Sequence, residues 1–231
     1  MTEPRVIPML VTELILPEED RERLGTTVWP VVAHAVVHRD GVFLFDTGMG
    51  LGNDEIDELF SPRTTPIERA LADHGIDLAE VTGVANCHLH FDHAGQNVRL
   101  PGGPPIFVQA SEWSKVHEPD YTVAEWVDAP GLRYEVVDGE VEVAPGLRLL
   151  PTPGHTPGHQ SLVVGSPDGP VVLAGQAVQG VREWAGEEPS GVPEPGSDLR
   201  EAYLDSTARL RALGPARVHF AHDPQVWIRP S

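Results

Sequence analysis

Six consecutive residues, His-Leu-His-Phe-Asp-His at positions 88–93, place four side chains that bind metals well in one short stretch. They follow the apolar run 83–87, Gly-Val-Ala-Asn-Cys, which predicts a β-strand. Side chains alternate faces in an extended segment, so we expect His88 and His90 to point the same way. A helix that begins near Asp92 would bring the other two ligands beside them. Imidazole and carboxylate together suit divalent ions with open coordination positions, so a chain that turned from strand to helix here would place these side chains around a metal site.

Two later segments also place histidines next to turn-forming residues. The run 151–159 reads Pro-Thr-Pro-Gly-His-Thr-Pro-Gly-His, and its prolines and glycines restrict the backbone around two histidines. The run 220–223, Phe-Ala-His-Asp, lies at the end of a predicted strand. Functional residues often lie in loops at strand ends. Histidines from three such segments can converge on one edge of a sheet.

The rest of the sequence predicts a mixed α and β protein. Short apolar runs bounded by turn residues predict strands over 31–38, 42–45, 83–87, 105–110, 134–137, 141–143, 147–150, 161–164, 171–174 and 217–221. Helices are predicted from a Thr65 cap to Gly75, from a Ser111 cap, and from an Asp198 cap to about Leu213. The segment 180–198, rich in Gly, Pro and Glu, predicts a mobile loop.

Composition narrows the classes of partner. The chain has 231 residues, 40% hydrophobic and 22% charged, which is typical of a soluble globular protein with a sizeable core. Its formal net charge of −19 argues against nucleic acid or an anionic membrane as a partner. No apolar run reaches the roughly 18 residues that a transmembrane helix needs. We therefore expect a small-molecule substrate, with no nucleic acid and no membrane partner.

The N-terminal residues and the cysteine content bear on localisation. Residues 1–20 lack the basic and apolar regions of a signal peptide. Cys87 is the only cysteine, so no internal disulfide can form, which fits a reducing cytoplasm. We expect a cytoplasmic protein in which Cys87 is a small buried strand residue rather than a metal ligand.

The motifs together resemble the metallo-β-lactamase superfamily. They are the runs 88–95, HLHFDHAG; 155–161, HTPGHQS; 45–49, FDTGM; and the terminal pair His222-Asp223. The likeness extends from about Val31 to Asp223, most of the chain. Within the superfamily, the sequences of these runs are similar to the motifs of the N-acyl homoserine lactone lactonase branch.

This resemblance implies a fold and a set of metal ligands. The implied fold is of the α+β class, a four-layer αβ/βα sandwich in which two mixed β-sheets pack face to face between helices. Residues 1–231 would form a single domain of this kind. One metal would take His88, His90 and His155, and a second would take Asp92, His93 and His222. Asp46 and His159 would hold these ligands and their loops in place.

The sequence departs from the family pattern at Gln176. The family usually places there an aspartate that bridges both metals, and an amide supplies one neutral oxygen instead of two charged ones. Two dications about 3.5–4 Å apart repel, and bridging anions normally offset that repulsion. Gln176 is therefore an uncertain metal ligand, and two alternatives stay open: a retained pair of metals, or one dominant metal. Zinc is the expected metal, with one or two ions per chain, and iron or manganese are alternatives.

The resemblance also implies a reaction and two catalytic residues. A metal-activated hydroxide attacks a carbonyl in this family, and Asp92 would orient or relay a proton. Gln179 occupies a position where lactonases of this branch often carry a tyrosine, and its amide N–H could donate to the substrate carbonyl. The favoured function is hydrolysis of a carbonyl ester, above all a lactone such as an N-acyl homoserine lactone. The alternatives are a thioesterase, a non-hydrolytic mononuclear metal enzyme, and a metal-poor binding protein with the same fold.

The substrate pocket is less defined by the sequence. Four tryptophans in loop-like or helix-start contexts could line an apolar, acyl-accepting cleft: Trp29, Trp113, Trp126 and Trp184. The acidic segment 180–198 could act as a lid that disfavours strongly anionic substrates. A homodimer is expected from the resemblance alone.

Overall fold

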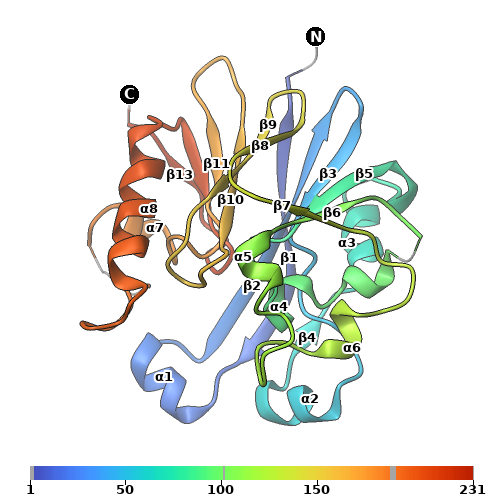
Figure 1. Cartoon of the computed structure of the whole chain (residues 1–231), viewed down its shortest axis with the longest axis vertical. Coiled ribbons are helices and arrows are strands. Elements are labelled where there is room, and N and C mark those ends of the chain that lie inside the picture. The colour runs from blue at the N-terminus through green and yellow to red at the C-terminus, as the bar shows by residue number, and fades with distance from the viewer. Residues whose placement is uncertain (1–2, 101, 188–190, 231) are drawn as a thin grey trace.

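Two β-sheets pack face to face, with helices on their outer sides, in the computed structural model, which describes residues 3–100, 102–187 and 191–230 (Figure 1). The first sheet has seven strands in the order β4-β1-β2-β3-β5-β6-β7. Their bounds are β1 Arg5–Ile15, β2 Val28–His38, β3 Gly41–Phe45, β4 Arg63–Thr64, β5 Val81–Ala85, β6 Ile106–Gln109 and β7 Tyr134–Val137. Antiparallel pairs join β4, β1, β2 and β3, and parallel pairs join β3, β5, β6 and β7, so the sheet is mixed.

The second sheet has six strands in the order β13-β12-β11-β10-β9-β8. Their bounds are β8 Val141–Ala144, β9 Leu147–Pro151, β10 Gln160–Val164, β11 Val171–Leu173, β12 Arg217–His219 and β13 Trp227–Ile228. All neighbouring pairs are antiparallel except β11 and β12, which are parallel because helix α8, Arg200–Ala212, connects them. This sheet is therefore also mixed, as the fold class requires.

The hydrophobic core lies in three layers. Between the sheets, Phe43, Phe45 and Ala85 of the first sheet pack with Leu149 and Leu162 of the second in one buried cluster. A second cluster joins the outer face of the first sheet to helix α3, and a third joins the outer face of the second sheet to helices α7 and α8. Strands covered on both faces read as almost unbroken apolar runs, which is why β3 and β10 could be predicted. The four-layer αβ/βα sandwich is thereby confirmed.

The helices are short apart from α8. Their bounds are α1 Glu18–Leu24, α2 Asp54–Phe60, α3 Ile67–Asp73, α4 Phe91–Ala94, α5 Ala110–Trp113, α6 Ala124–Val127, α7 Val181–Trp184 and α8 Arg200–Ala212, with single 3-10 turns at Leu78–Glu80 and Asn97–Arg99. In the described part of the chain, none of the helices has the length and apolar character needed to cross a bilayer.

Three predicted helix caps differ from the structure. Helix α3 follows Pro66, and Thr65 does not cap it, because the Gln96 side chain accepts a hydrogen bond from the Ile67 amide at 2.7 Å instead. Helix α5 begins at Ala110, before Ser111, and α8 begins after Leu199 with no side-chain cap from Asp198. At α3, a contact with the distant residue Gln96 thus takes the place of a local side-chain cap. A local sequence pattern does not reveal such a contact.

The predicted loop 180–198 is also only partly a loop. Its first residues form α7, and Trp184 is buried against the outer face of the second sheet. Residues 188–190 lie outside the described residues. The N-terminal strand β1 was not predicted, although Ile7, Met9 and Val11 are buried alternately along it. Pro8 interrupts the β-branched run there, which lowers its strand propensity.

Candidate metal centre

Three loops at strand ends bring the predicted ligands together. The segment 88–93 follows β5, the segment 152–159 joins β9 to β10, and His222 follows β12. Strand β5 ends at Ala85, so His88 and His90 lie in a loop rather than in the strand, and His90 immediately precedes α4. Two groups of three side chains result, each with ligand atoms within 4.8 Å of one another: His88, His90 and His155, and Asp92, His93 and His222.

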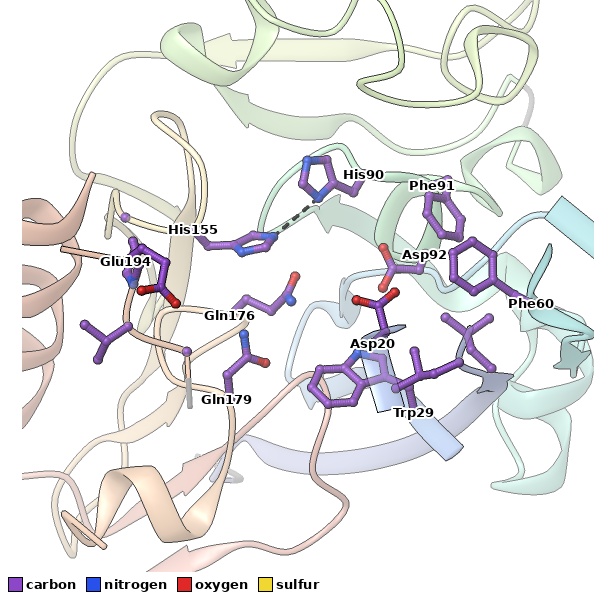
Figure 2. Close-up of a pocket in the computed structure, with 16 residues that line it drawn as sticks. Asp20, Trp29, Phe60, His90, Phe91, Asp92, His155, Gln176, Gln179 and Glu194 are labelled. Carbon is purple, nitrogen blue, oxygen red and sulfur yellow. Dashed lines mark hydrogen bonds between the residues drawn. The ribbon is translucent and has the colours of Figure 1, made fainter. Parts of the chain in front are cut away.

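The first group consists of three imidazoles. Nδ1 of His90 lies 3.3 Å from Nε2 of His155, and Figure 2 marks this contact with a dashed line. The His88 ring centroid lies 4.4 Å from that of His90 and 4.6 Å from that of His155. Nε2 of His88 is buried and has no hydrogen-bond partner among the described residues. A buried nitrogen without a partner is costly in a folded protein, unless an ion takes its lone pair.

The second group combines one carboxylate with two imidazoles. Oδ2 of Asp92 lies 3.3 Å from Nε2 of His93 and 3.6 Å from Nε2 of His222. Both of these nitrogens are buried, and neither has a hydrogen-bond partner within residues 3–100, 102–187 and 191–230. The Asp92 oxygen and the two Nε2 atoms therefore face one another closely, and neither nitrogen forms a hydrogen bond to any described residue.

The opposite ring nitrogens of these histidines are held by the protein. Nδ1–H of His93 donates to Oδ2 of Asp46 at 3.1 Å, and Nδ1–H of His222 donates to the Pro30 carbonyl at 2.8 Å. Nδ1 of His88 lies 3.1 Å from Sγ of Cys87. Each contact turns Nε2 toward the centre of its group and fixes the tautomer that can bind a metal. Asp46 adopts a left-handed φ of 63° to reach both His93 and the Cys87 amide, at 2.7 Å.

His159 is oriented differently from the six converging residues. Its Nδ1–H donates to the Thr152 carbonyl at 3.0 Å, and its Nε2 accepts from the Gln176 backbone N–H at 2.9 Å. Both nitrogens are used, so this imidazole does not offer a free lone pair. It instead fixes the backbone of Gln176 at the edge of the site.

In the metal-free site, the surroundings favour neutral His88, His155 and His222 and ionised Asp92, whereas they favour the protonated form of His93. Burial lowers the pKa of His88 and of His155, and neighbouring histidines lower both further. Burial lowers the pKa of His222 to about 4. Burial opposes ionisation of Asp92, but His93 and His222 hold its pKa well below the usual range. Burial also opposes protonation of His93, but the carboxylates of Asp92 and Asp46 together raise its pKa well above the usual value.

The residues present fit a metal ion. Three orphaned Nε2 atoms, a carboxylate oxygen and two further imidazoles converge, and imidazole with carboxylate is a donor set for zinc and other first-row divalent ions. Sγ of Cys87 also lies within two candidate groups, with His88 and His159 and with Asp46 and His93. Burial raises the pKa of the Cys87 thiol, and its partners already use their facing atoms, so the thiol fits a packing and hydrogen-bonding role.

A pocket of about 590 Å³ opens onto both groups (Figure 2). Its polar side carries His90, Asp92, His155, Gln176 and Gln179, and its apolar side carries Leu14, Leu16, Trp29, Phe60 and Phe91. The side chain of Gln176 extends into the pocket between His155 and Asp92, and Gln179 lies beside it. Oε1 of Gln179 is buried without a hydrogen-bond partner in the described chain.

Some pocket residues differ from the sequence-based expectation. Of the four tryptophans considered, Trp29 lines the pocket, whereas Trp126 and Trp184 pack in the hydrophobic clusters and Trp113 packs against Tyr134. Leu14 and Leu16 were missed because β1 was missed, and the alternation along β1 is the signal that could have revealed them. Residues 191–194 also line the pocket, so part of the predicted lid segment does border the site.

Comparisons with known proteins agree with this geometry. A family model for the metallo-beta-lactamase superfamily matches residues 26–222. An N-acyl homoserine lactonase of a Bacillus species is 33% identical over 210 residues, 84% of this chain and 81% of that protein. The N-acyl homoserine lactonase AiiA of Bacillus thuringiensis subsp. kurstaki is 33% identical with the same coverage. The crystal structure of a quorum-quenching N-acyl homoserine lactone hydrolase superposes with a TM-score of 0.78 at 29% identity, over 97% of this chain and 94% of that one.

The fold and the converging ligands define a metallo-hydrolase of lactonase-like type. The chain belongs to the metallo-β-lactamase superfamily, and within it is similar to the N-acyl homoserine lactonases.

Proposed function

We propose that this protein is a metal-dependent lactonase that hydrolyses N-acyl homoserine lactones. The observation that carries the proposal is the placement of two adjacent three-ligand groups at the polar end of a pocket whose other wall is apolar. A lactone that carries an acyl chain fits such a pocket, because its carbonyl group needs polar surroundings and its chain needs an apolar surface. The similarity to characterised N-acyl homoserine lactonases supports the same substrate class.

The metal ligands in this proposal are the six converging residues: His88, His90 and His155 at one position, and Asp92, His93 and His222 at the other. Zinc is the proposed metal. When bound there, it would lower the pKa of a water molecule toward about 7 and polarise the substrate carbonyl. Asp46 would keep His93 in the metal-binding tautomer, and His159 would hold the loop that carries Gln176.

The ligand Asp92 and the nearby Gln179 would act on the substrate or its proton, and Gln176 would affect metal binding. The carboxylate of Asp92 is ionised and faces the pocket, where it can accept and return the proton that moves to the leaving alkoxide. The amide of Gln179 can donate to the lactone carbonyl oxygen. Gln176 brings an amide to the same edge, and its missing negative charge favours weaker binding of one of the two ions.

The apolar wall and the acidic rim would select the substrate. Phe60 and Phe91 lie with their rings 5.4 Å apart and form, with Trp29, a surface for an acyl chain. Asp20 and Glu194 border the same pocket and add negative charge. Neutral lactones are therefore preferred over phosphodiesters, in agreement with the net charge of −19.

A panel of substrates tests the proposal. Zinc-, manganese- and iron-loaded protein is assayed on N-acyl homoserine lactones, simple lactones and acyl thioesters, with a chelator-treated sample and Asp92→Asn as controls. We expect the highest kcat/KM on N-acyl homoserine lactones, with loss of activity in both controls. A preference for thioesters would instead identify a thioesterase, and ligand binding without turnover would identify a binding protein.

A further inference from the structure

Glu112, the third residue of α5, has a fully buried side chain although it lies outside both ligand groups. A carboxylate is rarely buried unless hydrogen-bond donors surround it. The hydrogen-bond donors around the Glu112 carboxylate therefore indicate the structural role of this side chain.

Three donors meet the two carboxylate oxygens. The backbone N–H of Leu89 donates to Oε1 at 2.8 Å, and the hydroxyl of Thr156 donates to Oε2 at 2.6 Å. The hydroxyl of Tyr121 also donates to Oε1. The carboxylate thus links three segments that are far apart in the sequence.

Each donor lies next to a member of the three-histidine group. Leu89 stands between His88 and His90, so its fixed amide sets the direction in which both side chains leave the backbone. Thr156 follows His155 directly. The Tyr121 ring lies 4.9 Å from the His90 ring, at an interplanar angle of 63°. One side chain therefore contacts the surroundings of all three imidazoles.

The backbone packing beside Glu112 leaves little room for the loops to move. A Cβ atom at Gly158 would lie 2.0 Å from the Glu112 backbone nitrogen, so the segment that carries His155 lies directly against α5. Only glycine permits this approach. The hydrogen bonds of Glu112 therefore join segments that are already in contact.

We infer that Glu112 is a positioning residue that assembles His88, His90 and His155 before the metal binds, and so sets the affinity of that one metal position. The inference rests on the metal binding in the proposed function. Partners that orient metal ligands typically change metal affinity by about 10–100-fold when they are removed. We expect a loss in that range for Glu112→Ala at the three-histidine position, and a much smaller loss for Glu112→Gln, whose amide retains most of the shape and hydrogen bonding.

Glu183 provides a matched control. It is also buried, and its carboxylate accepts from the Gln179 amide at 2.9 Å, from the Gly191 amide at 3.1 Å and from the Tyr203 hydroxyl at 2.8 Å. None of these three donors is adjacent in the sequence to a histidine of the three-histidine group, and the one that packs against this segment, Tyr203, contacts Gly154 through its backbone rather than through its hydroxyl. Glu183→Ala therefore reports the general effect of removing a buried, three-donor carboxylate.

The experiment measures zinc affinity of the full chain by competition with a chromophoric chelator, so it does not depend on turnover. Glu112→Ala, Glu112→Gln and Glu183→Ala are each made alone and in two backgrounds. His155→Ala removes the three-histidine position, and His222→Ala removes the other. Such a cycle isolates the position on which Glu112 acts.

We expect Glu112→Ala to weaken zinc binding by about 10–100-fold in the His222→Ala background, and to have little effect in the His155→Ala background. Unchanged affinity in the first background would overturn the inference, and so would an equal loss from Glu183→Ala. If Glu112→Ala does not fold, Thr156→Val removes one of the three bonds at a neutral side chain, and it should still weaken the same position. If the zinc affinities change as expected but the zinc-loaded wild-type protein hydrolyses no lactone, the result counts against the proposed function and not against the role of Glu112.

Discussion

The backbone N–H of Gln176 donates to Nε2 of His159 at 2.9 Å, and this hydrogen bond fixes the Gln176 backbone at the edge of the candidate metal centre. Nδ1–H of His159 is fixed in turn by the Thr152 carbonyl at 3.0 Å. The Gln176 side chain lines the pocket beside His155 and Asp92, so we expect its charge to affect metal binding.

Gln176→Asp should tighten the more weakly bound of the two metals, because a carboxylate adds the negative charge that offsets repulsion between two dications. We expect a gain of at least about tenfold in zinc affinity, measured by competition titration. Gln179→Asp is the control, since it adds the same charge three residues further on. Equal gains from both variants would show that general charge, not the position of Gln176, controls affinity.

Asp46→Asn should weaken metal binding at the position that contains His93. The asparagine N–H₂ would face Nδ1–H of His93, and relief of that clash favours the tautomer with a proton on Nε2. We expect a loss of about 10–100-fold in zinc affinity, with secondary structure retained in circular dichroism. Wild-type affinity would mean that the Asp46 contact does not select the tautomer.

Phe60→Ala should reduce activity on long-chain substrates more than on short-chain ones, because the Phe60 ring forms part of the apolar wall. We expect kcat/KM for a decanoyl substrate to fall by about tenfold, or about 1.4 kcal/mol, and that for a butanoyl substrate to change little. The neighbouring Leu59 is 53% exposed and does not line the pocket, so Leu59→Ala is the control. A uniform decrease for all chain lengths would contradict this assignment of the wall.

The metal-free protein should lose stability as the pH falls from about 6.5 to 4. His34 and His219 pack between the two sheets with ring centroids 5.3 Å apart, and three of their four nitrogens have no hydrogen-bond partner in the described chain. Burial lowers the pKa of His219 to about 4, and burial with the His219 charge lowers that of His34 well below its usual value. The unfolded chain therefore binds protons in this range that the folded chain does not, and acid favours unfolding.

Removing one of these histidines should reduce that pH dependence. His219→Leu should decrease the slope of the free energy of unfolding by about 1.4 kcal/mol per pH unit between pH 6 and 4.5, measured by urea titration. His74→Gln, at an exposed histidine, should leave the slope as in the parent protein. An unchanged slope in His219→Leu would mean that its imidazole gains a proton without opening the core.

Much of the fold could be predicted because the relevant signals are local. The hairpin of β2 and β3 follows from two apolar runs around Arg39-Asp40-Gly41, and Gly41 adopts a φ of 131° there. Strands β9 to β11 likewise follow from short apolar runs. Strand β1 was missed because Pro8 interrupts the apolar run, although buried residues alternate along it.

In the candidate site, too, some features follow from local sequence motifs and others depend on the complete fold. The six converging residues stand in short motifs, so the sequence alone predicted which side chains meet. Asp46, which contacts His93, also stands in a motif, but two other groups around the site do not. The Pro30 carbonyl that accepts from His222 is 192 residues away from it in the chain, and Glu112, which accepts from Thr156, is 44 residues from that residue. Such partners belong to no motif, and packing of the complete fold brings them into contact.

The most direct test of the account is ring opening of an N-acyl homoserine lactone by the zinc-loaded protein, followed by mass spectrometry of the product. Wild-type protein should add one water molecule to the lactone, and His155→Ala, which removes a proposed metal ligand that lines the pocket, should lose nearly all of this activity. Equal ring opening by both proteins, or none by zinc-loaded wild type, would contradict the account.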